Sequence, residues 1–324
     1  MINLRYHIVS IVAVFLALGI GVALGSSFVD GFVVDTLRRN VDSLESDRDS
    51  LRDQVGLLQD ELDTTRSAHE SELETLLPLA TTDRLADRPV MIIATQGADS
   101  DAWELVRDSL LQSSATYEGT LWLSDRLDLS EAGNRTAIAD ALGLVTDNES
   151  VVRPALLLRF ARALFPDDVD GSANLGIDNI TDTETLSDTL VSLRDAALIS
   201  FDNDQARTGA LADVPAFGTV YIILGDEDVA LAADQMVVPL LAEALDENLD
   251  PFAVVVQPKP ADSETPRDSY VTAIRSDDSL NGSFATVDSV DTFDGILSMI
   301  LLAERRETGH LGVAPSAAAR LPDP

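Results

Sequence analysis

The stretch PVMIIATQGADS, residues 89–100, predicts how the larger part of this chain folds. Its first seven residues form an apolar run rich in branched side chains, which is typical of a strand buried on both faces. Gln96 and Gly97 indicate a turn, and Asp99 and Ser100 suit a helix start because their side-chain oxygens accept hydrogen bonds from its first N–H groups. The helix that follows carries its apolar residues on one side, at Trp103, Leu105, Val106, Leu110 and Leu111.

Strand-like and helix-like segments alternate through the rest of this region. Further strands are expected at 115–124, 219–224, 252–257, 270–275 and 284–287. Further helices are expected at 130–142, 150–164, 183–199, 229–246 and 291–306. Continuous apolar strands that alternate with helices favour a mainly parallel sheet covered on both faces, that is, an α/β sandwich. We predict that this extracytoplasmic α/β domain occupies residues 78–312 and that residues 313–324 form a flexible tail.

The N-terminal segment IVSIVAVFLALGIGVALGSSFV, residues 8–29, contains no charged residue. Its length suits the roughly 30 Å hydrocarbon core of a bilayer, so residues 1–29 are predicted to form a transmembrane helix. Arg5 before the segment and Asp30 after it favour a cytoplasmic N-terminus, with the remainder of the chain outside. A cleaved signal peptide is the alternative, but the long apolar run and the helical pattern that continues after it favour an uncleaved anchor.

Small residues recur every four positions in this segment, at Ala17, Gly21 and Gly25. Such a ridge allows two membrane helices to approach closely, and it favours self-pairing. The alternative is that these are the glycines common in membrane helices.

A heptad pattern follows in residues 30–77, which we expect to form a coiled-coil stalk. The seam is formed by apolar residues at alternating spacings of three and four, with Arg48 in one seam position: Val34, Leu37, Val41, Leu44, Leu51, Val55, Leu58 and Leu62. Pro78 is expected to end the helix. A narrow apolar stripe needs a partner, so we predict a parallel homodimer; folding back onto the α/β domain is the alternative.

Composition excludes several classes of function. The formal net charge of −34 repels phosphates, which excludes nucleic-acid binding. The absence of cysteine excludes disulfides, thiolate metal sites and a cysteine nucleophile. Lys259 is the one lysine beside many arginines, a bias typical of a GC-rich or salt-adapted genome.

The sequence motifs of common enzymes are also missing. The sequence contains no G-x-S-x-G, no G-x-x-x-x-G-K-[ST] and no H-E-x-x-H motif, and we expect a non-enzymatic protein. His7, His69 and His310 are too dispersed to form one metal centre within a chain.

Other side chains that could bind a metal ion or ligand are interpreted as structural or surface residues. Residues following predicted strands are Gln96, Asp99, Asp226, Glu227, Asp228 and Lys259. The three consecutive acids are interpreted as solvated surface, residues 167–171 as a turn, and the methionines Met91, Met236 and Met299 as core residues. No bound cofactor is predicted.

Three parts of the sequence stand out at the two ends of the chain: MINLRYHIVS at residues 1–10 with VAVFLALGIGVALGSS after it, TVDSVDT at 286–292, and GHLG at 309–312. Together they resemble the actinobacterial copper transport protein family known as MctB. The resemblance implies copper efflux across the cell envelope, with copper as the transported or sensed ion, by a protein described as an outer-membrane pore. Outer-membrane pores are closed barrels, whereas this sequence offers one apolar helix, so we favour an inner-membrane anchor.

Three interpretations of function are considered. The first is a dimeric, membrane-anchored envelope protein that acts in copper export or homeostasis. The second is an envelope scaffold or ligand-sensing protein without copper activity of its own, in contact with other envelope proteins; it is supported by the scarcity of copper ligands. A third, an α/β enzyme acting on envelope material, has no catalytic motif to support it.

Overall fold

The computed structural model describes residues 4–165, 183–206, 211, 219–225, 231–247, 249, 251–258 and 269–322. Several residues considered in the sequence lie outside these ranges, namely Asp226, Glu227, Asp228, Lys259 and the segment 167–171. The chain divides into two compact units, Met1–Ala68 and His69–Pro324. The predicted boundaries at 29/30, 77/78 and 312/313 stay predictions.

A single N-terminal helix, α1, runs from Leu4 to Thr81. Its segment Tyr6–Gly25 is long and apolar enough to cross a membrane, a test that signal sequences also pass. The prediction that Pro78 ends the helix is wrong, because Pro78 lies within it. Pro78 has no N–H to donate to the Glu74 carbonyl, but its own carbonyl still accepts a hydrogen bond from the Thr82 N–H at 2.9 Å, so the last turn of the helix closes.

Within the described residues, seven strands form one sheet in the order β3-β2-β1-β4-β5-β6-β7. The strands are β1 (Pro89–Thr95), β2 (Thr116–Leu123), β3 (Ile199–Asp202), β4 (Val220–Leu224), β5 (Ala253–Val256), β6 (Ala285–Val287) and β7 (His310–Leu311). All neighbours are parallel except β2 and β3. The predicted mixed α/β class with a mostly parallel sheet is therefore confirmed.

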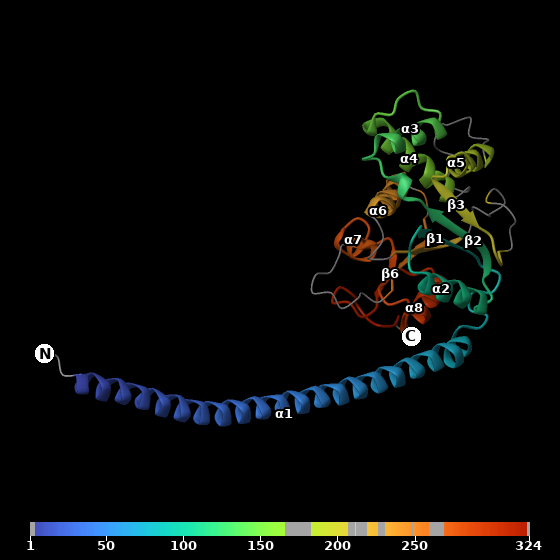
Figure 1. Ribbon diagram of the computed structural model, residues 1–324. Coiled ribbons are helices and arrows are strands. Elements are labelled where there is room, and N and C mark those ends of the chain that lie inside the picture. Colours follow the sequence, from blue (N-terminus) through green and yellow to red (C-terminus); the bar gives the residue numbers. More distant parts are fainter. Residues whose placement is uncertain are drawn as a thin grey trace. The chain divides into compact units, whose positions relative to one another are not determined.

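Helices cover both faces of the sheet (Figure 1). One face packs against α2 (Ser100–Gln112), α8 (Phe293–Arg305) and Leu77 near the end of α1. The other packs against α3 (Ala132–Ala141), α4 (Glu149–Leu164), α5 (Thr183–Asp195), α6 (Leu231–Asp246) and α7 (Tyr270–Ser276), with the short 3-10 turn η1 (Asp125–Leu127) beside them. Side chains of β1 alternate between the two cores, because successive residues of a strand point to opposite faces.

One predicted strand is a helix. Residues 270–275 were expected to be extended because of their branched and aromatic side chains, but they form α7. The Ser269 hydroxyl accepts a hydrogen bond from the Thr272 N–H at 3.1 Å and so caps the helix start. Tyr270, Val271 and Ile274 are buried at helical spacing, and this tertiary burial outweighs their strand propensity.

Two strands are absent from the sequence prediction. The expected helix at 183–199 ends at Asp195, and Ile199 begins the antiparallel edge strand β3. At the other edge β7 has two residues, which is too short for an alternating pattern to be recognised. Both strands depend on hydrogen bonds to a neighbouring strand rather than on a local signal.

The segment after β7, predicted as a flexible tail, makes contacts with the domain. Leu311 bridges to Ala319, and the Ala318 N–H donates to the His310 carbonyl at 2.7 Å. Further on, Arg320 pairs with Asp294 of α8 at 3.2 Å, and its carbonyl accepts a hydrogen bond from Ser298 at 3.0 Å. Residues 313–320 therefore form a strap across the end of the domain.

Candidate functional site

The residues predicted for helix pairing in the membrane lie on the surface of α1. Ala17, Gly21 and Gly25 are exposed, and a methyl group added at Gly21 or Gly25 would meet nothing within 4 Å. Gly21 stands 16 residues before Leu37, which corresponds to about 160° around a helix of about 3.6 residues per turn. The ridge of small residues and the heptad seam therefore occupy different faces of α1.

The described side chains of the predicted seam are more than half exposed in the single chain. They are Leu37, Val41, Leu44, Leu51, Val55, Leu58 and Leu62; the Val34 side chain lies outside the described residues. The structure confirms a helix over the whole predicted stalk, whereas the coiled coil itself is not shown.

A second cluster lies at the β6–β7 edge of the sheet and contains both C-terminal motifs. Arg275 of α7 and Asp288, which follows β6, form a salt bridge of 2.6 Å, with side-chain exposures of 3% and 0%. The same guanidinium donates to the Thr286 hydroxyl at 2.8 Å and to the Leu311 carbonyl at 2.8 Å. Burial of this charge pair is tolerated because the hydrogen-bonding groups around it are paired.

Asp288 also organises the strap. Its carboxylate accepts hydrogen bonds from the N–H groups of Val313 at 2.7 Å and Ala314 at 3.2 Å. The backbone can approach this closely because residue 312 is glycine: a Cβ there would lie 2.1 Å from Oδ1 of Asp288, and φ is +136°. The TVDSVDT and GHLG segments, far apart in sequence, thus meet at one carboxylate.

His310 completes the cluster through both ring nitrogens. Nε2 lies 3.0 Å from the Asn281 carbonyl, which can only accept, so Nε2 carries a proton. Nδ1 lies 2.9 Å from the Thr286 hydroxyl, whose oxygen already accepts from Arg275, so that hydroxyl donates to Nδ1. Burial, together with the nearby Arg275 charge, lowers the pKa of His310 and favours this neutral form. His310 is therefore held in place by hydrogen bonds at both ring nitrogens.

Among the described residues, no group of three histidine, aspartate or glutamate side chains is arranged to hold a metal ion. Of the soft ligands that Cu(I) prefers, the chain has no cysteine, and the thioethers of Met91, Met236 and Met299 are at most 5% exposed.

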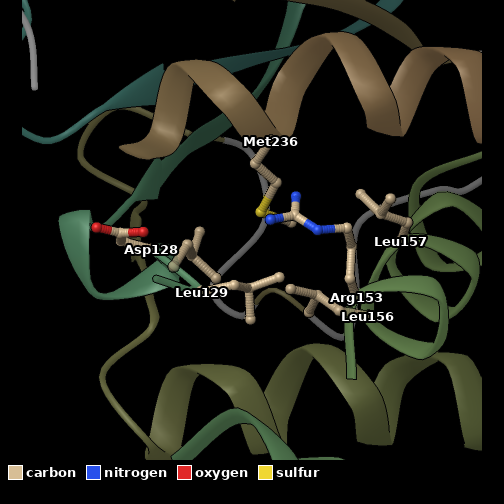
Figure 2. A pocket seen from close by; sticks show the side chains of 7 residues that line it. Asp128, Leu129, Arg153, Leu156, Leu157 and Met236 are labelled. Atoms are coloured by element: carbon tan, nitrogen blue, oxygen red, sulfur yellow. The ribbon is translucent and has the colours of Figure 1, made fainter. Parts of the chain in front are cut away.

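A surface pocket, shown in Figure 2, lies between η1, α4 and α6. It is a shallow hollow, open to solvent, whose lining includes Asp128, Arg153 and Met236. Arg153 pairs with Glu149 at 2.8 Å. Hydrogen bonds from the Ser130 N–H and hydroxyl lower the pKa of Asp128, whose carboxylate points away from Met236. With its charged groups already paired and a single thioether, the pocket offers no copper-binding set.

The carboxyl end of the sheet is where doubly wound folds usually bind ligands, at the point where strand order reverses, here between β1 and β4. Gln96 is exposed there and lies 3.4 Å from the Ser200 hydroxyl. Asp99 caps α2 by accepting from the Asp101 N–H at 2.8 Å. Asp226, Glu227 and Asp228, which follow β4 at this edge, lie outside the described residues.

The sequence reasoning missed Arg275, because it was placed on a strand, and the pocket residue Asp128. A signal for the C-terminal cluster was present: two short motifs rich in Asp, Thr, Gly and His stood out at 286–292 and 309–312. Nothing in the sequence indicated that Arg275 would join them, because it lies on neither motif.

The fold and these sites define a class: an α/β domain with a doubly wound sheet, preceded by a long helix with an apolar N-terminal segment. The family described as "Copper transport outer membrane protein, MctB" matches residues 1–322, and the chain belongs to this family. The predicted resemblance is thereby confirmed.

Individual members of the family are similar in sequence to this chain over nearly its whole length. The protein named Copper transporter MctB in Mycobacterium tuberculosis strain H37Rv is 26% identical over 330 residues, covering 96% of this chain and 95% of that protein. The relative of the same name in Mycobacterium leprae is 26% identical and is covered over 98% of both chains.

Proposed function

We propose that this chain acts in copper efflux or copper homeostasis in the cell envelope, as a non-enzymatic, membrane-anchored homodimer. The single observation that supports the copper role best is the family match, which extends over residues 1–322 and thus includes both the apolar helix and the α/β domain. Relatives matched over more than nine-tenths of their length are named as copper transporters.

Anchoring is supported by the segment Tyr6–Gly25, whose 20 residues span about 30 Å as a helix and whose side chains are exposed. We favour a single pass through the inner membrane with the C-terminal domain outside the cytoplasm. Cell fractionation with a probe for the C-terminal domain tests this: recovery in the outer-membrane fraction, or as a soluble shortened form, contradicts it.

Copper is proposed as cargo rather than as a resident cofactor. Among the described side chains of the α/β domain, His310 is the one histidine, and both of its ring nitrogens already form hydrogen bonds within the protein. Copper would then be handled at a site shared between subunits, by a partner protein, or by oxygen ligands of low selectivity, for which the acidic surface supplies many carboxylates.

The experiment is complementation with the full chain in a copper-sensitive host that lacks its own family member. Growth in copper and cell-associated copper are measured. We expect restored growth and lower cell copper, with loss of both for Asp288→Ala, which removes the counterion of a buried arginine. Asp294→Ala, the same change in an exposed pair, is the matched control. No change in either readout with an expressed, folded chain would contradict the copper role.

The second candidate is a dimeric envelope scaffold or ligand-sensing protein without copper activity. The observation that favours it is the paucity of free soft ligands among the described residues, where the methionines are core residues. Failed complementation together with no copper binding tighter than about 10 µM in a calorimetric titration, while self-association persists, would select this candidate.

A further inference from the structure

Along residues 37–62 of α1 the heptad seam is an exposed apolar stripe, and apart from Leu57 the large side chains of the other faces are polar. Between Leu37 and Leu62 its apolar side chains are 52–67% exposed in the single chain. A long helix with one narrow apolar stripe and polar remaining faces is stabilised chiefly by packing that stripe against a partner. The residue types in the stripe define which partner fits.

The two seam positions are occupied by different residue types. Besides Arg48, position a holds the β-branched Val41 and Val55 and, in the last heptad, Leu62, while the described d positions hold leucine at residues 37, 44, 51 and 58. β-Branched residues at a with leucine at d favour parallel two-stranded coiled coils, whereas isoleucine at d shifts the preference to trimers or tetramers. The occupant that fits is one second helix, aligned in the same direction.

The flanking charges complement a second copy of the same segment. In a parallel, in-register pair, a g residue lies beside the e residue five positions later in the other chain. Asp47 occupies g and Arg52 occupies e, so Asp47 meets the partner's Arg52, and Gln54 likewise meets the partner's Gln59. Within the single chain Arg52 approaches Asp49 only at 3.8 Å, with both side chains more than half exposed.

Arg48 occupies an a position in the middle of the seam. A charged residue at a costs stability but specifies register and the number of strands. In register, each Arg48 lies at the same level as Asp47 of both chains. A shift of one heptad would instead place it opposite the partner's Val41 or Val55.

We propose that residues 37–62 of α1 bind the same segment of a second copy as a parallel, in-register, two-stranded coiled coil, with Asp47 paired to the partner's Arg52. This inference rests on the self-association within the proposed function and specifies its orientation and register. The small-residue ridge at Ala17, Gly21 and Gly25 faces away from this seam and forms no part of the contact.

Disulfide cross-linking tests orientation and register, because the chain contains no cysteine of its own. Leu44→Cys and Leu58→Cys are introduced singly into the full chain in native membranes, with Ser46→Cys on the outer helix face as control. We expect each of the first two to cross-link to itself and the control to remain unlinked. In an antiparallel pair residue 44 would instead face residue 55, so efficient linking of mixed Leu44→Cys and Val55→Cys chains would overturn the inference while leaving self-association intact.

Charge exchange tests the proposed pairs. Asp47→Arg creates two repulsive Arg–Arg contacts in the homodimer, and Arg52→Asp creates two Asp–Asp contacts, but a dimer of one variant with the other restores both pairs. With differently tagged full chains at about 50 mM salt, we expect the mixed dimer to be favoured roughly tenfold over either homodimer, and less so at about 0.5 M. Asp53→Arg carries the same charge change on the outer face and should show no preference.

Equal mixing of all variants would overturn the Asp47–Arg52 pairing. No cross-link at any position would overturn self-association through the seam. Because these readouts do not involve copper, they are independent of the complementation experiment.

Discussion

The two compact units of this chain place charged and apolar side chains in opposite environments. In the C-terminal unit, an arginine and an aspartate are buried side by side, with Asp288 fully inaccessible to solvent. In the N-terminal unit, leucines and valines are mostly exposed, including Leu44 at 67%. The usual preference of charges for water and apolar groups for the interior holds for neither set.

The difference lies in where the partners of these groups are found. Arg275 and Asp288 have theirs within the same unit, because hydroxyls, carbonyls and N–H groups of the surrounding segments satisfy both charges. The seam side chains of α1 between Leu37 and Leu62 are more than half exposed in the single chain. The C-terminal unit therefore contains the contacts it needs, whereas we propose that the N-terminal unit is covered by lipid along one segment and by a second copy along the other.

Removing the buried carboxylate is expected to have the largest effect. Asp288→Ala leaves the Arg275 guanidinium buried without a counterion and should lower the free energy of unfolding by about 3–5 kcal/mol. Denaturant unfolding followed by fluorescence measures this, since Trp103 and Trp122 both lie in the C-terminal unit. Asp294→Ala, which breaks the more exposed pair with Arg320, should cost less than about 1 kcal/mol. Equal losses of unfolding free energy in the two variants would contradict the expectation that the buried Arg275–Asp288 pair contributes more than the Asp294–Arg320 pair.

Truncating a leucine in each unit tests the contrast directly. Leu121→Ala opens a cavity beneath the central sheet, where the side chain is fully buried, and should cost about 2–5 kcal/mol. Leu51→Ala, at 60% exposure, should change the unfolding of the C-terminal unit by less than about 0.5 kcal/mol but weaken self-association of the full chain. Sedimentation in detergent measures the second effect. A Leu51→Ala chain that self-associates normally would show that the exposed stripe is not a contact.

Adding one methyl group at the strap should also be costly. Gly312→Ala places a Cβ against the Asp288 carboxylate and strains a backbone with φ of +136°, so we expect a loss of about 2–3 kcal/mol. Gly282→Ala is the matched control, because a Cβ there meets nothing within 4 Å and should change stability by less than about 1 kcal/mol. Thermal unfolding of the two variants compares them, and a tolerated Gly312→Ala would mean that the strap moves away from Asp288 without penalty.

The smallest expected effect is the pH dependence of His310. Its pKa in the folded state is below the ordinary 6.5, so the unfolded chain binds more protons as the solution is acidified. The stabilisation is therefore present above pH 6.5 and is lost as the pH falls through the folded-state pKa. His310→Gln can keep both hydrogen bonds without titrating.

Unfolding free energies at pH values between about 7.5 and 5.5 test this prediction. The variant should lose less stability than the original chain over this interval. An identical pH dependence in both proteins would contradict the role of His310.

Much of the fold could be predicted because its signals are local. The strands β1, β2, β4, β5 and β6 are short apolar runs, and the long helix shows its period over many turns. The predictions were wrong where contacts between distant residues decide the secondary structure. Tyr270–Ser276 was predicted as a strand but is a helix. The strands β3 and β7 were not predicted, because they have only four and two residues.

The sequence by itself determined the apolar N-terminal segment, the position of the heptad seam and the parallel α/β class, because each of these repeats or persists along neighbouring residues. Only the tertiary structure decided that Arg275, Asp288 and His310 form one cluster and that residues 313–320 lie against the domain. These contacts join residues up to 41 positions apart, as between Arg275 and Ser316. No local pattern encodes such a pairing, because it depends on how the sheet brings its last strands and the following strap together.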